Sequence, residues 1–189
     1  LQGDVGSGKT VVATIAALQV IENGSQVAFM APTEILAEQH YRKLHEWLTP
    51  LDIEVAWLTG SQSKKDREIS LKMTQSGEAH IVVGTHALFQ EHVIFNKLGL
   101  SIIDEQHRFG VEQRLALRKK GQLDKANEPH QLMMSATPIP RTLSMSYFAD
   151  LDVSIIDELP KGREAIVTKL FSEDPVSYTH LRAHETGRN

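Results

Sequence analysis

The first residues with recognisable chemistry stand at the start of the chain, where a glycine-rich segment runs into a helical pattern. They match the spacing G-x-x-x-x-G-K-[ST] and are Gly3, Asp4, Val5, Gly6, Ser7, Gly8, Lys9 and Thr10. Glycines let such a loop point its backbone N–H groups at a polyphosphate, and the helix N-terminus adds positive potential. Lys9 would reach the β and γ phosphates, and the Thr10 hydroxyl would ligate Mg2+. The alternative is a plain glycine-rich turn, and the complete match favours the phosphate site.

An acidic pair, Asp104 and Glu105, supplies the second part of a nucleotide site, directly after the apolar residues 100–103. Ligand sites in open parallel sheets lie at the carboxyl ends of strands, where Asp104 can hold Mg2+ directly or through water. Glu105 can position and deprotonate the water that attacks the γ-phosphate. Two acids after an apolar strand are more often a solvated turn, so the pair gains its weight from the phosphate loop. Together the two motifs predict nucleoside triphosphate hydrolysis.

The elements that must position these residues follow an alternating pattern. Short β-branched runs alternate with stretches of helical period, which predicts an α/β fold with a mainly parallel sheet flanked by helices. Predicted helices cover residues 9–22, 34–48, 63–76 and 141–149, and predicted strands cover residues 26–30, 55–59, 79–84, 100–104, 131–135 and 153–156. The first helix is expected to gather its apolar side chains near one face, with Val12, Ile15, Ala16, Leu18 and Ile21. The strand leading into the phosphate loop is expected to be missing, because the chain begins only two residues before Gly3.

Composition narrows the class of protein. The chain has 189 residues, of which 41% are hydrophobic and 23% charged, as in an ordinary globular protein. Its net charge of -4 means that any contact with nucleic acid needs a local basic or backbone-amide surface. No apolar run approaches the roughly 20 residues that cross a bilayer, so we expect a soluble protein with no membrane partner. The absence of cysteine excludes disulfides and thiolate metal sites and agrees with a cytoplasmic setting.

Five further segments identify a family. They read APTEILAEQH, LTGS, VVGTHALFQ, DEQHRFG and MSATPIPRT. Their order and spacing resemble the first motor domain of superfamily-two DNA helicases, most closely the RecG family, from Leu1 to about Phe171. The resemblance implies a RecA-like P-loop fold that uses ATP and Mg2+ to translocate on branched or forked DNA in recombination and repair, in the bacterial cytoplasm. Transcription-repair coupling factors are the alternative, although their acidic motif typically reads Asp-Glu-Glu-Gln.

The resemblance also implies roles for residues outside the nucleotide site. Residues expected to meet the phosphates of DNA are Pro32, Thr33, Thr59, Gly60, Thr85 and His86. Each pair lies where a predicted strand ends, and hydroxyls and backbone amides there can fix a phosphate backbone without reading sequence. Such residues more often serve only as local helix caps, and that alternative stays open. Residues expected to couple the γ-phosphate to those loops are Gln106, His107, Ser135, Ala136 and Thr137.

The domain plan follows from the same resemblance. Residues 1–157 are interpreted as the first RecA-like domain, 158–171 as a linker and the start of a second motor domain, and 172–189 as an unassigned tail that resembles no part of the family. In that tail His180 and His184 have helical spacing, but no third metal ligand is evident. Activity is expected to need the second motor domain and an N-terminal wedge domain. A P-loop kinase of small molecules and a nucleotide-dependent binding module are the alternatives from other classes.

Overall fold

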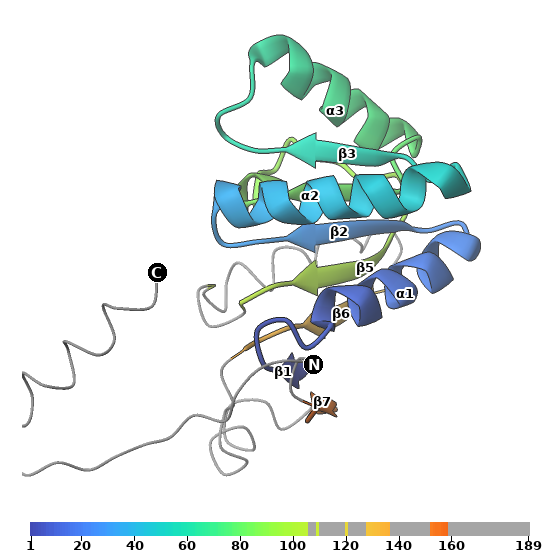
Figure 1. The fold of residues 1–189 in the computed structure, drawn as a ribbon. Coiled ribbons are helices and arrows are strands. Elements are labelled where there is room, and N and C mark those ends of the chain that lie inside the picture. Colours follow the sequence, from blue (N-terminus) through green and yellow to red (C-terminus); the bar gives the residue numbers. More distant parts are fainter. Residues whose placement is uncertain (106–108, 110–119, 121–127, 137–151, 159–189) are drawn as a thin grey trace, which may run out of the picture.

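The computed structural model describes residues 1–105, 109, 120, 128–136 and 152–158. In these residues a five-stranded, fully parallel sheet has the order β3-β4-β2-β5-β6 (Figure 1). Its strands are β2 (Gln26–Met30), β3 (Val55–Leu58), β4 (Ile81–Gly84), β5 (Leu98–Ile103) and β6 (His130–Met133). The helices are α1 (Lys9–Glu22), α2 (Glu34–Leu48) and α3 (Lys64–Ser76), with short 3-10 helices η1 (Thr49–Leu51) and η2 (His86–Phe89). The predicted α/β fold is confirmed.

Helices cover both faces of this sheet. Alternate residues of β2 point to opposite faces, so that Val27 and Phe29 join one hydrophobic cluster and Ala28 and Met30 join the other. The first cluster contains the buried side chains of α1 and α2, which lie together in front of the sheet in Figure 1. The second cluster contains η2, with side chains of α3 packed against it. Burial on both faces explains why the central strands are continuously apolar.

The helix α1 has the predicted bounds but not the predicted buried face. Its buried residues are Ala13, Thr14 and Ala17, whereas Ile15 is 62% exposed and Val12 is also exposed. This helix is apolar on nearly every side, so the spacing of its large side chains does not select one face. The small side chains face the sheet instead, which allows the backbone of the helix to approach β2 and β5 closely.

A short strand precedes the phosphate loop, which corrects the expectation that this strand is missing. Gln2–Gly3 forms β1 and pairs in parallel with β7, Ile155–Ile156. On its other side Gln2 forms a bridge with Ser135, just beyond β6. Two residues suffice because both neighbours supply backbone partners, which satisfy the donors and acceptors of β1.

Most other boundaries agree with the sequence predictions. The helix α2 and the strand β2 have the predicted bounds, and α3 has the predicted Ser63 N-cap and ends at Gly77, whose φ is 85°. The predicted helix at 141–149, the linker at 158–171 and the tail at 172–189 lie almost entirely outside the described residues, so the division into domains stays a prediction. No helix within the described ranges is both long and apolar enough to cross a membrane.

Candidate nucleotide and nucleic-acid site

The phosphate loop connects β1 to α1 at the carboxyl end of the sheet. Gly6 and Gly8 have φ angles of 82° and 94°, in the left-handed region that glycine adopts without strain. At Gly3 a Cβ atom would lie 2.5 Å from the Ser7 Oγ, so any larger residue there would require the Ser7 side chain to move. The loop therefore closes tightly on itself and delivers the chain into the N-terminus of α1, whose first N–H groups have no partner within the helix.

Lys9 folds back over this loop. Its Nζ donates hydrogen bonds to the carbonyl oxygens of Gly3 and Asp4, each at 2.8 Å. The loop is braced further by Asp4, whose carboxylate accepts from the Val5 N–H at 2.7 Å and whose carbonyl accepts from the Ser7 N–H. The ammonium of Lys9 is thus held across the concave side of the loop by groups that a phosphate oxygen can replace.

The lining of the loop also fits an anion. The Ser7 Oγ is buried and forms no hydrogen bond with the described residues. A buried hydroxyl without a partner costs free energy of about 1–3 kcal/mol, and a phosphate oxygen in the loop would remove that cost. The donor set of hydroxyl, ammonium and helix N–H groups matches the chemistry of a polyphosphate.

Asp104 follows β5 at the same edge of the sheet. It is 8% exposed, and its Oδ2 lies 2.7 Å from the Nε2 of His40, on α2. Its Oδ1 accepts from the Glu105 N–H at 3.0 Å, and its own N–H donates to the Met30 carbonyl at 2.9 Å. Glu105 has a φ of 51°, a left-handed conformation that costs a non-glycine residue roughly 1–2 kcal/mol and turns the chain sharply out of the strand.

Ser135 lies between these two parts of the site. Its carbonyl accepts from the Gly3 N–H at 3.3 Å, and its N–H donates to the Leu1 carbonyl at 3.2 Å. The preceding residue, Met134, donates its N–H to the Ile103 carbonyl at 2.8 Å, next to Asp104. The predicted coupling segment therefore begins where the phosphate loop and the acidic pair are closest in the sheet order. Of its other members Ala136 follows directly, whereas Thr137, Gln106 and His107 lie outside the described residues.

The first predicted DNA loop, Pro32-Thr33, leads from β2 into α2. The Thr33 hydroxyl accepts from the Leu36 N–H at 3.3 Å, so it is the N-cap of α2. This is the local role that the sequence left open for such residues, and the exposed Thr33 still lies at the surface. The next residue, Glu34, accepts hydrogen bonds from both the backbone N–H and the hydroxyl of Ser61, at 3.2 Å and 2.8 Å.

The other two predicted DNA loops contain one buried and one exposed residue each. Thr59 and Thr85 are 0% and 1% exposed, whereas Gly60 and His86 lie at the surface. The Thr85 Oγ1 is buried without a hydrogen-bond partner among the described residues. Any contact of these loops with DNA is therefore expected from the backbone and from the exposed members rather than from the two threonine hydroxyls.

Arg67, on α3, connects the loop at Thr59-Gly60 to the segment that follows η2. Its guanidinium donates to the Thr59 carbonyl at 3.4 Å and to the Gln90 side-chain oxygen, and it lies 3.0 Å from the Nε2 of His92. Because Ser61 binds Glu34, side-chain contacts connect the loop at Thr59-Gly60 both to the start of α2 and to the segment after η2. The sequence analysis missed Arg67, since a basic residue on a polar helix carries no signal of its partners.

His40 is the second functional residue that sequence reasoning missed. It lies at helical spacing with Ala37 and Leu44 on the buried face of α2. A polar side chain at a buried position of an amphipathic helix is a signal that a partner exists, because buried polar groups are hydrogen-bonded. Nothing in the sequence identified that partner as Asp104, which lies 64 residues away.

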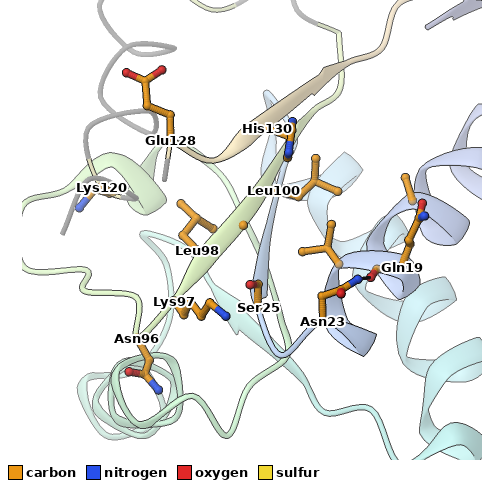
Figure 2. A pocket seen from close by; sticks show the side chains of 13 residues that line it. Gln19, Asn23, Ser25, Asn96, Lys97, Leu98, Leu100, Lys120, Glu128 and His130 are labelled. Carbon is orange, nitrogen blue, oxygen red and sulfur yellow. Dashed lines mark hydrogen bonds between the residues drawn. The ribbon is translucent and has the colours of Figure 1, made fainter. Parts of the chain in front are cut away.

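A cavity of about 800 Å³ lies at the opposite edge of the sheet, next to the starts of β2, β5 and β6. Figure 2 shows its polar lining, including Asn23, Asn96 and His130. Lys120 borders it and donates to the carbonyls of Gln90 and Val93; burial lowers the pKa of its ammonium, and the Glu91 charge opposes that effect. None of the predicted site residues lines this cavity, so it is separate from the nucleotide site.

Comparison with known proteins identifies the family. The profile of the DEAD/DEAH box helicases matches residues 1–146. Since this match covers most of the chain, the chain belongs to the DEAD/DEAH box helicase family. Membership confirms the predicted helicase motor fold and the use of a nucleotide.

The particular relatives are RecG helicases. The ATP-dependent DNA helicase RecG of Haemophilus influenzae is 61% identical over 175 residues, which are 92% of this chain and 25% of that protein. RecG of Escherichia coli strain K12 is 60% identical over 168 residues, which are 89% of this chain and 24% of that protein. The chain thus spans about a quarter of the length of these relatives. The predicted resemblance to RecG is confirmed.

Comparison with solved structures agrees with these sequence relationships. A structure of RecG bound to a three-way DNA junction has a TM-score of 0.77 and 44% identity, covering 98% of this chain and 24% of that one. The yeast DEAD-box splicing factor Prp28 has a TM-score of 0.60 and 20% identity, covering 78% of this chain and 38% of that one, which shows a shared fold.

Proposed function

We propose that this chain is the ATP-binding motor domain of a RecG-type helicase, which couples ATP hydrolysis to translocation on branched DNA and to its remodelling. The observation that carries the proposal is the placement of the phosphate loop and the Asp104-Glu105 pair at one edge of the sheet, with the Ser135 segment between them. The RecG relatives, one of them solved on a three-way DNA junction, support branched DNA as the partner.

In this proposal the phosphate loop binds ATP. Lys9 exchanges its bonds to the Gly3 and Asp4 carbonyls for bonds to the β and γ phosphates, and the buried Ser7 hydroxyl gains an acceptor. The remaining contacts come from backbone N–H groups of the loop, including Gly6, and from the start of α1. Such contacts position the nucleotide without contributing a reacting atom.

Thr10 and Asp104 would hold Mg2+ in the same site. When bound, Mg2+ neutralises charge that develops on the transferred phosphoryl group. Within the described residues no cluster of three His, Cys, Asp or Glu side chains is arranged to hold a metal by itself. Mg2+ usually takes one or two carboxylates from the protein and completes its shell with phosphate oxygens and water.

Glu105 is the residue we assign to the attacking water. A carboxylate in this position accepts a proton from water as the bond to the γ-phosphorus forms. The left-handed backbone of Glu105 takes it out of the line of β5. Strained backbone of this kind is common at functional sites, where the surrounding structure maintains it.

The DNA-facing surface in this proposal consists of the three predicted loops, the first two of which are joined by the Glu34–Ser61 hydrogen bond. Backbone amides and exposed residues such as Gly60 and His86 would meet DNA phosphates. This mode of contact suits a protein with a net charge of -4, because it needs no extended basic patch. It also suits a motor that moves along DNA without reading its sequence.

The decisive experiment is phosphate release by the full-length protein, with and without a synthetic fork. We expect ATP hydrolysis that the fork stimulates. A small-molecule kinase would instead transfer phosphate to an acceptor and ignore DNA, and a binding module would retain ATP without releasing phosphate. Either result would contradict the proposed function.

A further inference from the structure

A buried polar pair connects the nucleotide edge of the sheet to α2. The His40 Nε2 and the Asp104 Oδ2 are 2.7 Å apart, and the residues are 9% and 8% exposed. The imidazole also packs against Phe29, with ring centroids 4.7 Å apart. The imidazole thus packs on an aromatic ring and is hydrogen-bonded to the carboxylate that we assign to Mg2+.

The hydrogen bonds of Asp104 leave it able to bind a cation. An ionised carboxylate only accepts, so the His40 Nε2 is the donor to Oδ2, while the Glu105 N–H donates to Oδ1 at 3.0 Å. Each oxygen has two lone pairs, and one donor on each leaves the second available. Carboxylates that bind metals are commonly held in this way, and their orientation depends on the partners that hold them.

Asp104 is also hydrogen-bonded to the two elements that flank the first predicted DNA loop, β2 and α2. Its backbone N–H binds the carbonyl of Met30, the last residue before that loop. Its side chain binds His40, about two helical turns beyond the Thr33 cap at which α2 begins. A shift of Pro32-Thr33 on DNA would therefore reach Asp104 through the strand and through the helix.

We propose that His40 is a positioning residue, which orients the Asp104 carboxylate toward Mg2+ and couples that carboxylate to the DNA-facing loop at Pro32-Thr33. The inference rests on the proposed function, because it assigns Asp104 to Mg2+. A purely structural role for His40 is the competing explanation. The two differ in what they predict for metal affinity in a variant that still folds.

Two variants of the full-length protein separate these explanations. His40→Phe keeps a planar ring against Phe29 and removes the donor, whereas His40→Gln retains an N–H donor of similar reach. Nucleotide affinity is measured with a fluorescent ATP analogue in Mg2+ and in EDTA, together with melting temperature and the Mg2+ requirement of the fork-stimulated ATPase. Nucleotide binding is measured without ATP turnover, so it reports on the metal site independently of catalysis.

We expect the Mg2+ concentration that His40→Phe requires for fork-stimulated ATPase activity to rise at least about tenfold, which is the usual effect of removing a partner of a metal ligand. Its nucleotide affinity in EDTA should equal that of the parent, and its fork stimulation at saturating Mg2+ should be lower. His40→Gln should stay within about threefold of the parent on each measure. If His40→Phe does not fold, His40→Asn replaces it, since its shorter amide cannot reach Oδ2, and the same increase is expected.

Three results would overturn the inference. They are an unchanged Mg2+ requirement in a folded variant without the donor, an equal loss of nucleotide affinity in Mg2+ and in EDTA, and a His40→Gln variant as impaired as His40→Phe. A parent protein that shows no Mg2+-dependent nucleotide binding would refute the proposed function instead. The parent measurement therefore distinguishes the two failures.

Discussion

The carbonyl oxygen of Ser135 accepts a hydrogen bond from the backbone N–H of Gly3, the first residue of the phosphate loop, at 3.3 Å. Through this bond the segment after β6 is attached directly to the loop that we assign to the triphosphate. On the other side of the segment, Met134 is bound to Ile103, one residue before Asp104. A change in the loop on release of phosphate therefore has a short backbone route to the acidic pair.

The assignment of Lys9 to phosphate predicts a separation of activities. In the full-length protein, Lys9→Ala should abolish ATP hydrolysis and leave fork binding largely intact, because the Lys9 ammonium faces the loop carbonyls rather than the predicted DNA surface. Phosphate release and gel-shift assays measure the two. Lys43→Ala, an exposed lysine on α2, is the control for loss of charge. Hydrolysis by Lys9→Ala near the parent rate would show that the phosphate-loop assignment is wrong.

The assignment of Glu105 to the attacking water predicts a different defect. Glu105→Gln keeps the size of the side chain and its hydrogen bonding but loses the base, so nucleotide should still bind while turnover falls by about two to four orders of magnitude. Equilibrium nucleotide binding and single-turnover phosphate release measure these quantities. Equal losses of affinity and rate would indicate a structural or metal-holding carboxylate instead.

Local sequence patterns predicted those helices and strands whose own residues carry caps, apolar spacing or flanking turns. The bounds of α2 follow from its Thr33 cap and apolar spacing, and β2 is a short apolar run between turn residues. The strand β1 carries no such signal, because two residues show no periodicity and its partner β7 lies about 150 residues further along the chain. The prediction of the buried face of α1 was wrong for another reason. Several faces of this helix are apolar, and packing against the sheet selects the alanines.

The residues of the candidate site likewise fall into those that local sequence patterns predicted and those that they did not. Lys9, Asp104 and Glu105 could be predicted because glycine spacing and a strand that ends in acids are local patterns. His40 and Arg67 could not, because their roles depend on partners that the fold brings together from distant parts of the chain. Physical contact between side chains on different elements is set by tertiary structure, which a single sequence does not display.

The joined loops predict a specific effect of Arg67 on DNA binding. Arg67→Ala removes the contacts to Thr59 and Gln90, so the Thr59-Gly60 loop should lose its fixed position relative to the segment after η2. We expect the fork concentration for half-maximal ATPase stimulation to rise by about 5- to 30-fold, equivalent to roughly 1–2 kcal/mol.

The matched control for this prediction is Lys65→Ala, which removes a positive charge from an exposed position of the same helix. It should change the required fork concentration by less than about twofold, as expected for a surface charge. Titration of both variants with fork DNA at fixed salt gives the comparison. Equal effects of the two substitutions would attribute the result to charge alone and exclude a positioning role for Arg67.

The hydrogen bonds of the Gln26 side chain are expected to stabilise the edge of the sheet opposite the candidate site. Its buried side chain donates to the carbonyls of Thr74 and Ala79 and accepts from the N–H groups of Asn96 and Lys97. Gln26→Met keeps the length of the side chain but leaves these backbone groups without that partner. The free energy of unfolding should fall by about 2–4 kcal/mol, measured by urea unfolding of the 189-residue chain with circular dichroism.

The control for Gln26 is Gln75→Met, at an exposed position of α3. A surface substitution of this kind usually changes the free energy of unfolding by no more than about 0.5 kcal/mol. Equal destabilisation by the two variants would mean that the buried hydrogen bonds of Gln26 contribute nothing beyond the general effect of the substitution.

The last prediction concerns the 189-residue chain assayed by itself, which we expect to hydrolyse ATP poorly and not to unwind a fork. It spans about a quarter of the RecG relatives, and the helicase resemblance implies that the nucleotide lies between two motor domains. The second domain would supply arginines that neutralise charge on the transferred phosphoryl group, and one such arginine is worth roughly a thousandfold or more in rate. Translocation further requires two lobes that open and close on the strand. Phosphate release and fork unwinding are measured for this chain and for the full-length protein under the same conditions, with Lys9→Ala as the background control. Full-length activity with an inactive isolated chain is the expected result, whereas robust fork-stimulated unwinding by the isolated chain would show that a single lobe suffices.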